Sequence, residues 1–289
     1  MPFFEDVDGT GIIEHHIKEV LRLEDDQQSI ILKRYKDIRL ELVDRLSKAP
    51  RGSFTAQHLR GVLGQVQGAI VAMTKHLNGA MVEGSQIAAL KGVNHLIKEI
   101  NLFDKKFAGA ITPIDLNAAL IAQDTAKLLV TRYKTNLDAY GSNLLAQVSN
   151  GLFSAAIGET SYEEIIGRVS HFFNAEEWKL RRIVRTELHG IYNRGKLAGL
   201  QELDDEGEEF LRTLMHPMDA RTGDDSKFAA TQGLVAKMGE PFHYVWDGKH
   251  RVFFTPPDRP NDRAVMVPYR KEWGRIQGKA FIPGNFPEA

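Results

Sequence analysis

The amino-acid sequence predicts an α+β protein: a predominantly helical N-terminal region followed by a small C-terminal module with short antiparallel strands. Over most of the first 200 residues, apolar side chains recur every three or four positions, which is typical of helices that bury one face. The segment 202–209 then contains six acidic residues and marks a shift in composition. Short runs rich in aromatic and β-branched residues follow, and these are typical of strands: 210–214, 242–246, 251–254 and 264–268.

The N-terminal region is expected to contain several separate helices. The first covers about 12–46 and presents one apolar face. The second begins after the potential cap Thr55, and a third covers about 80–104, so that the two could form an antiparallel hairpin. Glycine weakens a helix interior by up to about 1 kcal/mol relative to alanine. Three glycines in the second helix therefore suggest close approach of a neighbouring helix: Gly61, Gly64 and Gly68.

Later helices are predicted from the residues that start them. Thr112-Pro113 is typical of a helix N-terminus, and this helix is expected to reach about residue 138. Two shorter helices are expected over 142–157 and 165–173, the latter begun by the capping box Ser161-Tyr162-Glu163-Glu164. Asn174 is then expected to cap a long helix over about 175–203.

Three parts follow from this pattern: a helical region over 1–158, an α+β domain over 159–271 and an extended tail over 272–289. Within the α+β domain, Asp247-Gly248 between two apolar runs predicts a β-hairpin. A short helix is expected over about 226–238.

The composition narrows the classes of function. The net charge of -1 gives no overall drive toward nucleic acid or membrane, so any basic surface must be local. The absence of cysteine excludes disulfides, thiol nucleophiles and cysteine-ligated zinc. No stretch approaches the roughly eighteen apolar residues of a membrane span. The acidic N-terminus lacks the features of a signal peptide. We therefore expect a soluble protein made in the cytoplasm, with no membrane partner.

Histidines and aspartates in the turn-rich segments are the candidate metal ligands. The spacing His216-x-x-Asp219 could suit one metal ion, completed by His250 or Asp262. Aspartate and arginine alternating in turns more often form ion pairs and Asx-turns. We therefore expect a structural role without bound metal. The alternative is a metal-dependent nuclease or hydrolase that uses His216, Asp219 and Asp247. The full set of candidates is His216, Asp219, Asp224, Asp225, His243, Asp247 and His250.

Nucleophilic catalysis has no support in the sequence. A glycine-rich phosphate loop and a G-x-S-x-G elbow are both absent. Ser226 has no nearby histidine in sequence to activate its hydroxyl. We therefore expect that this chain is not an enzyme and that it uses no cofactor.

The long helix predicted over 175–203, with the residues just before it, has a local basic excess. Between positions 168 and 196, seven basic residues face three acids, an excess of four that could meet phosphates of double-stranded DNA without sequence preference. The other interpretation is a solvated helix face with intrahelical ion pairs. The candidates for DNA contact are Arg168, Lys179, Arg181, Arg182, Arg185, Arg194 and Lys196.

Four short motifs occur in a fixed order from this helix onward. They are Arg185-Thr186-Glu187, Asp219-x-Arg221-Thr222, Asp247-Gly248 and Pro256-Pro257-x-x-Pro260-Asn261-x-Arg263. In this order they resemble the phage Mu-type head morphogenesis, or minor head protein, family over about residues 160–270. The resemblance implies a structural protein of a tailed-phage head, located in the virion near the portal vertex and incorporated during assembly. It also implies the portal protein or the major capsid protein as partner, sometimes DNA, with 1–158 as docking arm.

One departure from the family changes what can be carried over. Many members carry cysteine after Arg-Thr and a His-Pro-x-Cys-x-Cys run near the end, which suggests a metal cluster. Here Gly223 follows Thr222, and aspartate and arginine stand in the final run. We therefore expect an ion-pair cluster that holds the same loops, with Glu187 paired to one of the loop arginines. Its members are Arg185, Glu187, Asp219, Arg221, Asp258, Arg259, Asp262 and Arg263.

Overall fold

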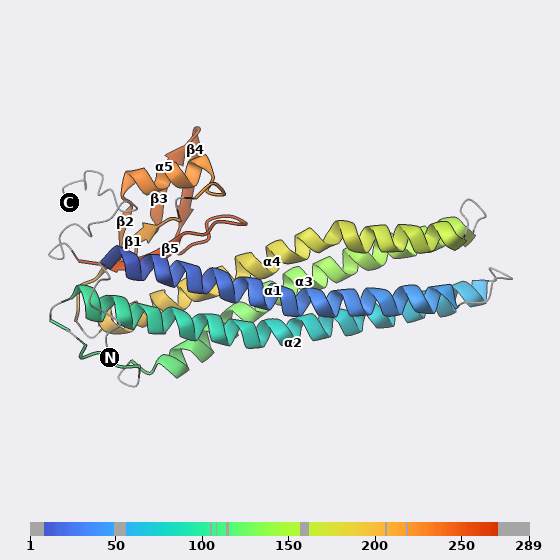
Figure 1. Ribbon diagram of the computed structural model, residues 1–289, viewed down its shortest axis with the longest axis horizontal. Helices are drawn as coiled ribbons and strands as arrows, with labels where there is room; N and C mark the ends of the chain where they lie inside the picture. Colours follow the sequence, from blue (N-terminus) through green and yellow to red (C-terminus); the bar gives the residue numbers. More distant parts are fainter. Residues whose placement is uncertain are drawn as a thin grey trace. The chain divides into compact units, whose positions relative to one another are not determined.

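The computed structural model describes residues 9–48, 56–104, 106–107, 109–113, 116–156, 162–205, 207–217 and 219–270. It confirms the α+β class (Figure 1). The long helices are α1 (Gly9–Ser47), α2 (Ala56–Phe103), α3 (Ala118–Ala156) and α4 (Tyr162–Asp205). A short helix α5 (Asp224–Gln232) and five short strands follow. Within the described ranges, no helix is long and apolar enough to cross a membrane.

The long helices are more continuous than the sequence suggests. The helical hairpin expected around residue 80 is wrong, because α2 runs unbroken through Gly79. The expected breaks before 142 and at Asn174 are also wrong, since α3 and α4 continue through both. Asn174 accepts a hydrogen bond from Arg39 instead of capping a helix. None of these helices contains proline, and buried packing outweighs the modest propensity loss of an interior glycine or asparagine.

The start of α3 differs in detail from the expectation. Thr112-Pro113 begins a turn rather than α3, with the Leu116 amide donating to the Thr112 carbonyl over 3.3 Å. Asn117 then adopts a φ of 48°, and α3 begins at Ala118. A residue with left-handed backbone does not continue a right-handed helix. Helix α3 therefore begins only after Asn117, a few residues beyond Thr112-Pro113.

The chain forms two compact units, and each is discontinuous in sequence. The first comprises Met1–Asp25, Gly84–Leu129 and Arg185–Ala289, and the second comprises Asp26–Glu83 and Val130–Val184. The unit boundaries therefore fall inside all four long helices and differ from the predicted boundaries of 1–158 and 159–271. The reason is that parts of the long helices pack in the same unit as the strands. The predicted tail over 272–289 lies outside the described residues.

The second unit has an aromatic centre. Tyr35 and Tyr140 are buried, and the Tyr140 hydroxyl donates to the Tyr35 hydroxyl over 2.7 Å. The Tyr35 hydroxyl in turn donates to the Phe173 carbonyl over 2.9 Å. Both phenols are thus satisfied inside the apolar core, as buried tyrosines require. This confirms the prediction that the apolar face of the first helix is buried at Tyr35.

The strands of the first unit form two small antiparallel sheets. In one, β1 (Leu211–Met215) pairs with β2 (Val235–Lys237) and with β5 (Val265–Tyr269). In the other, β3 (Phe242–Trp246) pairs with β4 (Lys249–Phe253).

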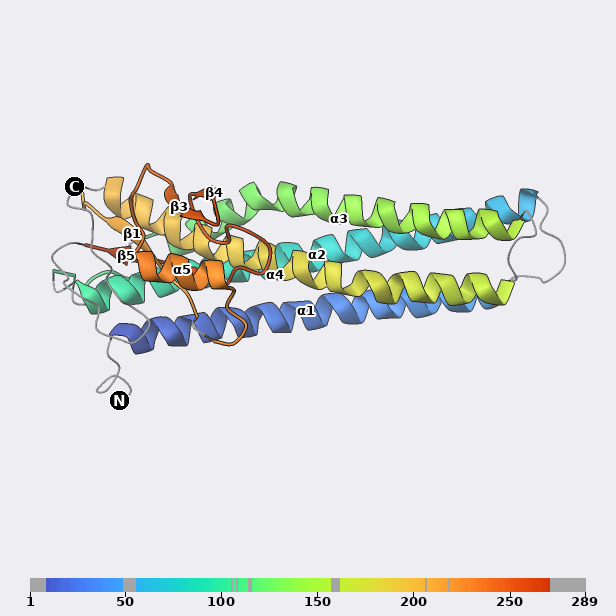
Figure 2. The same ribbon diagram turned by 90° about the horizontal axis from the view of Figure 1, so that it is seen from above.

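Local signals explain where these strands and α5 begin and end. Asp247 and Gly248 have φ values of 49° and 68°, as a two-residue hairpin turn requires, which confirms the predicted hairpin. Helix α5 is shorter than expected because it ends at Gly233, which has a φ of 57°. It lies beside β3, where the rings of Phe228 and Trp246 are 5.0 Å apart (Figures 1 and 2).

A buried arginine joins the two sheets. Arg212 on β1 has no exposed surface and donates to the carbonyls of Lys237 and Phe254, over 2.7 and 2.5 Å, and to that of Glu240. Its guanidinium also lies 5.0 Å from the ring centre of Phe242. A buried guanidinium needs several acceptors to offset its desolvation, and these carbonyls provide them.

Helices α2 and α4 approach most closely through two glycines in the first unit. A Cβ atom at Gly92 would overlap the Tyr192 carbonyl, and one at Gly195 would overlap the Ala89 carbonyl. The close approach expected at Gly61, Gly64 and Gly68 is wrong, since no heavy atom lies within 4 Å of a Cβ placed at any of them. Those glycines remain because an exposed helix position tolerates them at modest cost.

We predict opposite effects for two Gly→Ala substitutions. Gly195→Ala should lower the free energy of unfolding by about 1–3 kcal/mol, because the added methyl group meets backbone rather than a flexible side chain. Gly61→Ala should raise it by up to about 1 kcal/mol through helix propensity alone. Urea unfolding followed by circular dichroism measures both. Equal effects of the two substitutions would contradict the close approach.

Candidate functional site

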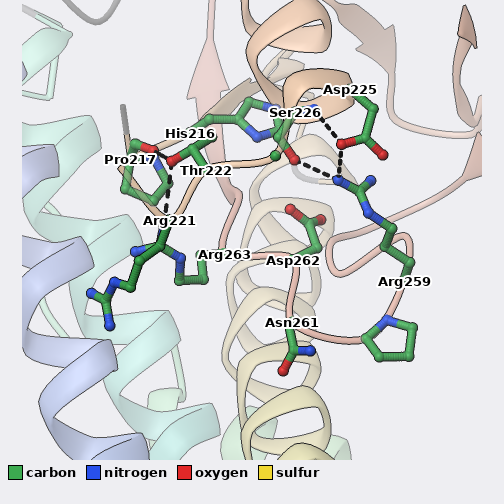
Figure 3. A pocket seen from close by; sticks show the side chains of 12 residues that line it. His216, Pro217, Arg221, Thr222, Asp225, Ser226, Arg259, Asn261, Asp262 and Arg263 are labelled. Atoms are coloured by element: carbon green, nitrogen blue, oxygen red, sulfur yellow. Dashed lines mark hydrogen bonds and ion pairs between the residues drawn. The ribbon is translucent and has the colours of Figure 1, made fainter. Parts of the chain in front are cut away.

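Three segments of the first unit surround a pocket of about 230 Å³ (Figure 3). They are the loop after β1, the start of α5 and the loop between β4 and β5. Residues of two of the four motifs, Asp219-x-Arg221-Thr222 and the run from Pro256 to Arg263, therefore meet at one place, although more than thirty positions separate the two loops. The lining residues are His216, Pro217, Arg221, Thr222, Gly223, Asp225, Ser226, Arg259, Pro260, Asn261, Asp262 and Arg263.

Asp219 and Arg263 form the first link between the two loops. The two terminal nitrogens of Arg263 donate to the two carboxylate oxygens of Asp219 over 2.8 and 2.5 Å. Asp219 also accepts the Arg221 amide over 2.9 Å, which makes an Asx-turn. Hydrogen bonds from Arg263 hold the pKa of Asp219 well below its usual range. Arg221 itself is farther away, 3.6 Å from the carboxylate, and largely exposed.

Arg259 forms the second link, from its loop to the first turn of α5. One terminal nitrogen donates to Asp258 over 2.9 Å, and the other donates to Asp225 and to the Ser226 hydroxyl over 2.5 and 2.7 Å (Figure 3). Asp258 also accepts the Tyr244 hydroxyl over 2.9 Å, which ties in β3. A planar guanidinium suits such a multi-point link better than an ammonium group. The sequence did not indicate the Arg259–Ser226 contact.

Asp262 stabilises its own loop rather than pairing with an arginine. Its buried carboxylate accepts the backbone amides of Asp258 and Ala264, each over 3.2 Å. The expectation of an ion pair at Asp262 is therefore wrong, because the carboxylate is aimed at the tight turn around it. The loop also reaches α4, where the Asn261 amide donates to the Thr186 hydroxyl over 3.5 Å.

Arg185 does not belong to this cluster. It pairs with Asp25 over 3.3 Å and lies 3.7 Å from Glu24, both on α1. The prediction for Arg185 is therefore wrong, since α1 packs along α4 and supplies nearer carboxylates. Glu187 is buried on α4, and its pairing with a loop arginine stays a prediction.

His216 is a buried histidine of the pocket. It is 5% exposed, and neither ring nitrogen has a hydrogen-bond partner among the described residues. Burial lowers the pKa of His216, so the ring is neutral near pH 7. Ser226 lines the same pocket, a proximity that the sequence did not indicate. His216 makes no hydrogen bond to the Ser226 hydroxyl, which accepts one from Arg259 instead.

The residues of the metal-dependent alternative are not gathered in the pocket. His216 lines it, whereas Asp219 faces Arg263 and Asp247 lies in the β3–β4 turn. Among the described residues, no group of three or more histidine, aspartate or glutamate side chains is arranged to hold a metal ion.

A first buried polar network on α4 fixes β5 and thereby the loop before it. His189 donates from Nδ1 to Glu24 over 2.7 Å and from Nε2 to the Ala264 carbonyl over 2.6 Å. Burial acts to lower the pKa of His189, but the charge and hydrogen bond of Glu24 raise it above its usual value. Asn193 accepts the Met266 amide over 2.7 Å. These contacts explain why the loop containing Asp262 has a fixed position against α4.

A second buried network joins α1, α2 and α4. Lys196 donates to both carboxylate oxygens of Glu99 over 2.6 Å, and His16 donates to the same carboxylate over 2.8 Å. His95 donates to Glu19 and accepts from Tyr192, over 2.8 and 2.9 Å. The rings of His16 and His95 stack with centres 3.7 Å apart.

The basic residues predicted to contact DNA have different environments. Lys196 is fully buried against Glu99, so its prediction as a DNA contact is wrong. Lys179 pairs with Glu176 and Arg181 with Glu177, each over 2.7 Å, as expected for a solvated helix face. The guanidinium of Arg182 lies 4.8 Å from the Trp178 ring centre, and Arg194 is exposed. The side chain of Arg168 lies outside the described residues.

Comparisons of this chain with protein-family models, curated proteins and solved structures give no match. What the site can do is therefore inferred from its own chemistry. Around the pocket, charge-assisted hydrogen bonds form a framework that cross-links two loops and helix α5. Such bonds are directional and about twice as strong as neutral ones.

We predict that Lys196→Met strongly destabilises the protein. The substitution leaves the Glu99 carboxylate buried without its cation, and breaking a buried pair in this way costs about 3–5 kcal/mol. Lys48→Met is the matched control, because its pair with Asp44 is exposed and worth about 0–1 kcal/mol. Urea unfolding measures both. Similar losses in the two variants would contradict the burial of the Lys196 charge.

We predict that the protein loses stability as the pH falls below about 6.5. Burial lowers the pKa of His16, and burial with the nearby His16 and Lys196 charges lowers that of His95. The unfolded chain then binds protons that the folded protein does not, at about 1.4 kcal/mol per pH unit for each histidine. The contribution of His189 to this pH dependence has the opposite sign, because its pKa is raised in the folded protein. That contribution stabilises the protein below pH 6.5 and is lost as the pH rises through the raised pKa.

Unfolding midpoints in urea at pH 7.5, 6.5 and 5.5 test this dependence. The midpoint should fall from pH 6.5 to 5.5, and His95→Gln should reduce that fall. The exposed His76 is the control position, and His76→Gln should leave the slope unchanged. A midpoint that is constant over this range would show that the buried histidines do not control acid stability.

Proposed function

We propose that this chain is a structural minor head protein of a tailed bacteriophage, which acts in capsid assembly near the portal vertex. The observation that carries the proposal is the convergence of three of the motifs behind the resemblance. The Asp219–Thr222 loop and the loop before β5 line one pocket and are joined by Arg263. The loop before β5 also donates a hydrogen bond from the Asn261 amide to Thr186 on α4. Motif residues that are far apart in sequence thus belong to one bonded framework, as expected if their role is to stabilise the fold of a domain.

The bonding within the framework favours a structural role over a reactive one. Both carboxylate oxygens of Asp219 are engaged by Arg263, and the Ser226 hydroxyl accepts a bond from Arg259. A catalytic base or nucleophile must be free to exchange a proton with substrate. Asp219 and Ser226 instead form hydrogen bonds that stabilise the loops around the pocket, where there is little regular secondary structure.

Exposed apolar side chains on the long helices supply candidate docking surface. In the second unit, Leu40, Val71 and Trp178 are 62%, 58% and 53% exposed. In the first unit, Leu128 is 79% exposed. Large apolar and aromatic side chains are the usual anchors of protein interfaces. We infer that the helices dock on the portal protein or the major capsid protein, and that the protein is located in the virion.

Double-stranded DNA is a further proposed partner. The basic residues available for it are fewer than the sequence suggested, because Lys196 is buried and Arg185 faces α1. Arg181, Arg182 and Arg194 remain for contact with phosphates, which would be non-specific and strongly weakened by salt.

We predict that the purified chain binds rings of the portal protein of the phage that encodes it. Binding should weaken at least about tenfold, or about 1.4 kcal/mol, in a triple variant with Leu40→Ser, Val71→Ser and Trp178→Ser. The control is Lys48→Ser, which removes an exposed charge from the same unit. Size-exclusion chromatography and sedimentation measure binding, and circular dichroism checks that the variants fold.

Two results would contradict this proposal. One is a folded chain that binds neither portal rings nor major capsid protein. The other is a DNA-cleaving or hydrolytic activity that requires Mg²⁺, Mn²⁺ or Zn²⁺ and is abolished by Asp219→Ala without unfolding. The second result would favour the metal-dependent alternative with His216, Asp219 and Asp247.

A further inference from the structure

The β3–β4 hairpin has one buried face and one exposed face. Phe242 and Tyr244 on β3 are buried, and the ring of Trp246 contacts α5. Because side chains alternate along a strand, the residues between them point to the opposite face. His243 and Val245 on β3 are exposed, and so are their direct cross-strand partners, Val252 and His250 on β4.

Two histidines meet on this exposed face. The distance between His243 Nε2 and His250 Nδ1 is 3.1 Å, and their ring planes are inclined by 26°. They occupy diagonal positions of adjacent strands, and the two-residue turn at Asp247 and Gly248 fixes the register. The pairing of β3 with β4 therefore places two imidazole nitrogens side by side.

We propose that His243 and His250 form a two-histidine clamp for a late first-row divalent metal ion, of the class of Zn²⁺, Ni²⁺ and Cu²⁺. An imidazole nitrogen binds Zn²⁺ at about 2.0–2.1 Å, so two nitrogens on one ion, at angles of about 90–110°, lie about 2.9–3.4 Å apart. The observed 3.1 Å falls within this range. The strands thus set the separation that chelation needs before any ion is present.

The chemistry of the ligands sets the metal class. Imidazole suits Zn²⁺, Cu²⁺ and Ni²⁺, whereas Mg²⁺ and Ca²⁺ prefer oxygen ligands. The two protein nitrogens leave further positions on the ion, which water would occupy. When the ion binds, the hydrogen bond between the rings is replaced by two metal–nitrogen bonds. The ring that donates this hydrogen bond moves its proton to its other nitrogen by exchange with water, so that each neutral ring binds the ion through one nitrogen and carries its proton on the other.

This clamp is separate from the loop framework. Neither His243 nor His250 lines the pocket around His216. The clamp also does not depend on the proposed role in phage assembly, because it follows from the hairpin geometry alone.

Titration of the untagged full-length protein with ZnCl₂, followed by calorimetry, tests the proposal. We expect one ion per chain at this site. His243→Gln and His250→Gln should each weaken Zn²⁺ binding by roughly 100-fold, because chelation by two linked ligands raises affinity by about 10²–10⁴ over one alone. The matched controls are His76→Gln and His171→Gln, which remove exposed histidines from α2 and α4. Both controls should bind Zn²⁺ as the wild type does.

A second readout is independent of affinity. In ¹⁵N-edited spectra of the histidine side chains, Zn²⁺ should shift His243 Nε2 and His250 Nδ1 selectively. The proposal is overturned by any of three results: no saturable Zn²⁺ binding up to millimolar concentration, unchanged binding in the double variant, or a loss smaller than tenfold in either single variant. Because all four positions are exposed, circular dichroism should show that every variant folds as the wild type does.

Discussion

The buried charges on α4 are the constraint on which the first unit depends. Lys196 and Glu99 are fully buried, and the pair is tolerated only because His16 and both lysine–carboxylate bonds satisfy the carboxylate. About two turns earlier on α4, both ring nitrogens of His189 donate hydrogen bonds, one to Glu24 and the other to the Ala264 carbonyl just before β5. A displacement of α4 along its axis would leave at least two charges unpaired in the core. The register of α1, α2 and β5 against α4 is therefore fixed by electrostatics as well as by packing.

That fixed register determines where the loops lie. Met266 bonds to Asn193, and Ala264 bonds to His189, so the end of the Asp258–Arg263 loop is attached to α4 at β5. Arg263 and Arg259 then extend from this loop to Asp219 and to the start of α5. The buried contacts of α4 thus fix β5, and β5 in turn fixes the Asp258–Arg263 loop. A substitution of Glu24 or Glu99, which are far from the pocket in sequence, would therefore shift the loop by disturbing the position of α4.

The sequence predicted what depends on neighbouring residues and missed what depends on distant ones. Strands β1, β3, β4 and β5 and the Asp247-Gly248 hairpin were predicted, because their alternation and turn chemistry are local. Strand β2 was missed, because it falls within the helix expected over 226–238. The breaks in α2 and α4 were predicted wrongly, because tertiary packing carries helices through residues of weak propensity. The partners of Arg185 and His189 lie on α1, 160 and 165 residues away, and no spacing rule connects them. The Asp219–Arg263 pair was expected only as a member of a cluster, and the structure supplies its two-point geometry.

Two arginines hold the loops around the pocket, and this differs physically from a central metal ion. A metal cluster holds loops through one central ion, so its loss releases all of them together. Here Arg263 joins Asp219, whereas Arg259 separately joins Asp258, Asp225 and Ser226. Removal of one arginine would therefore release one set of contacts and leave the other. Because Arg259, Asp225 and Asp258 are largely buried, salt would screen this link less than it screens exposed pairs. The loops are held by two independent cross-links that need neither a metal ion nor a particular redox state.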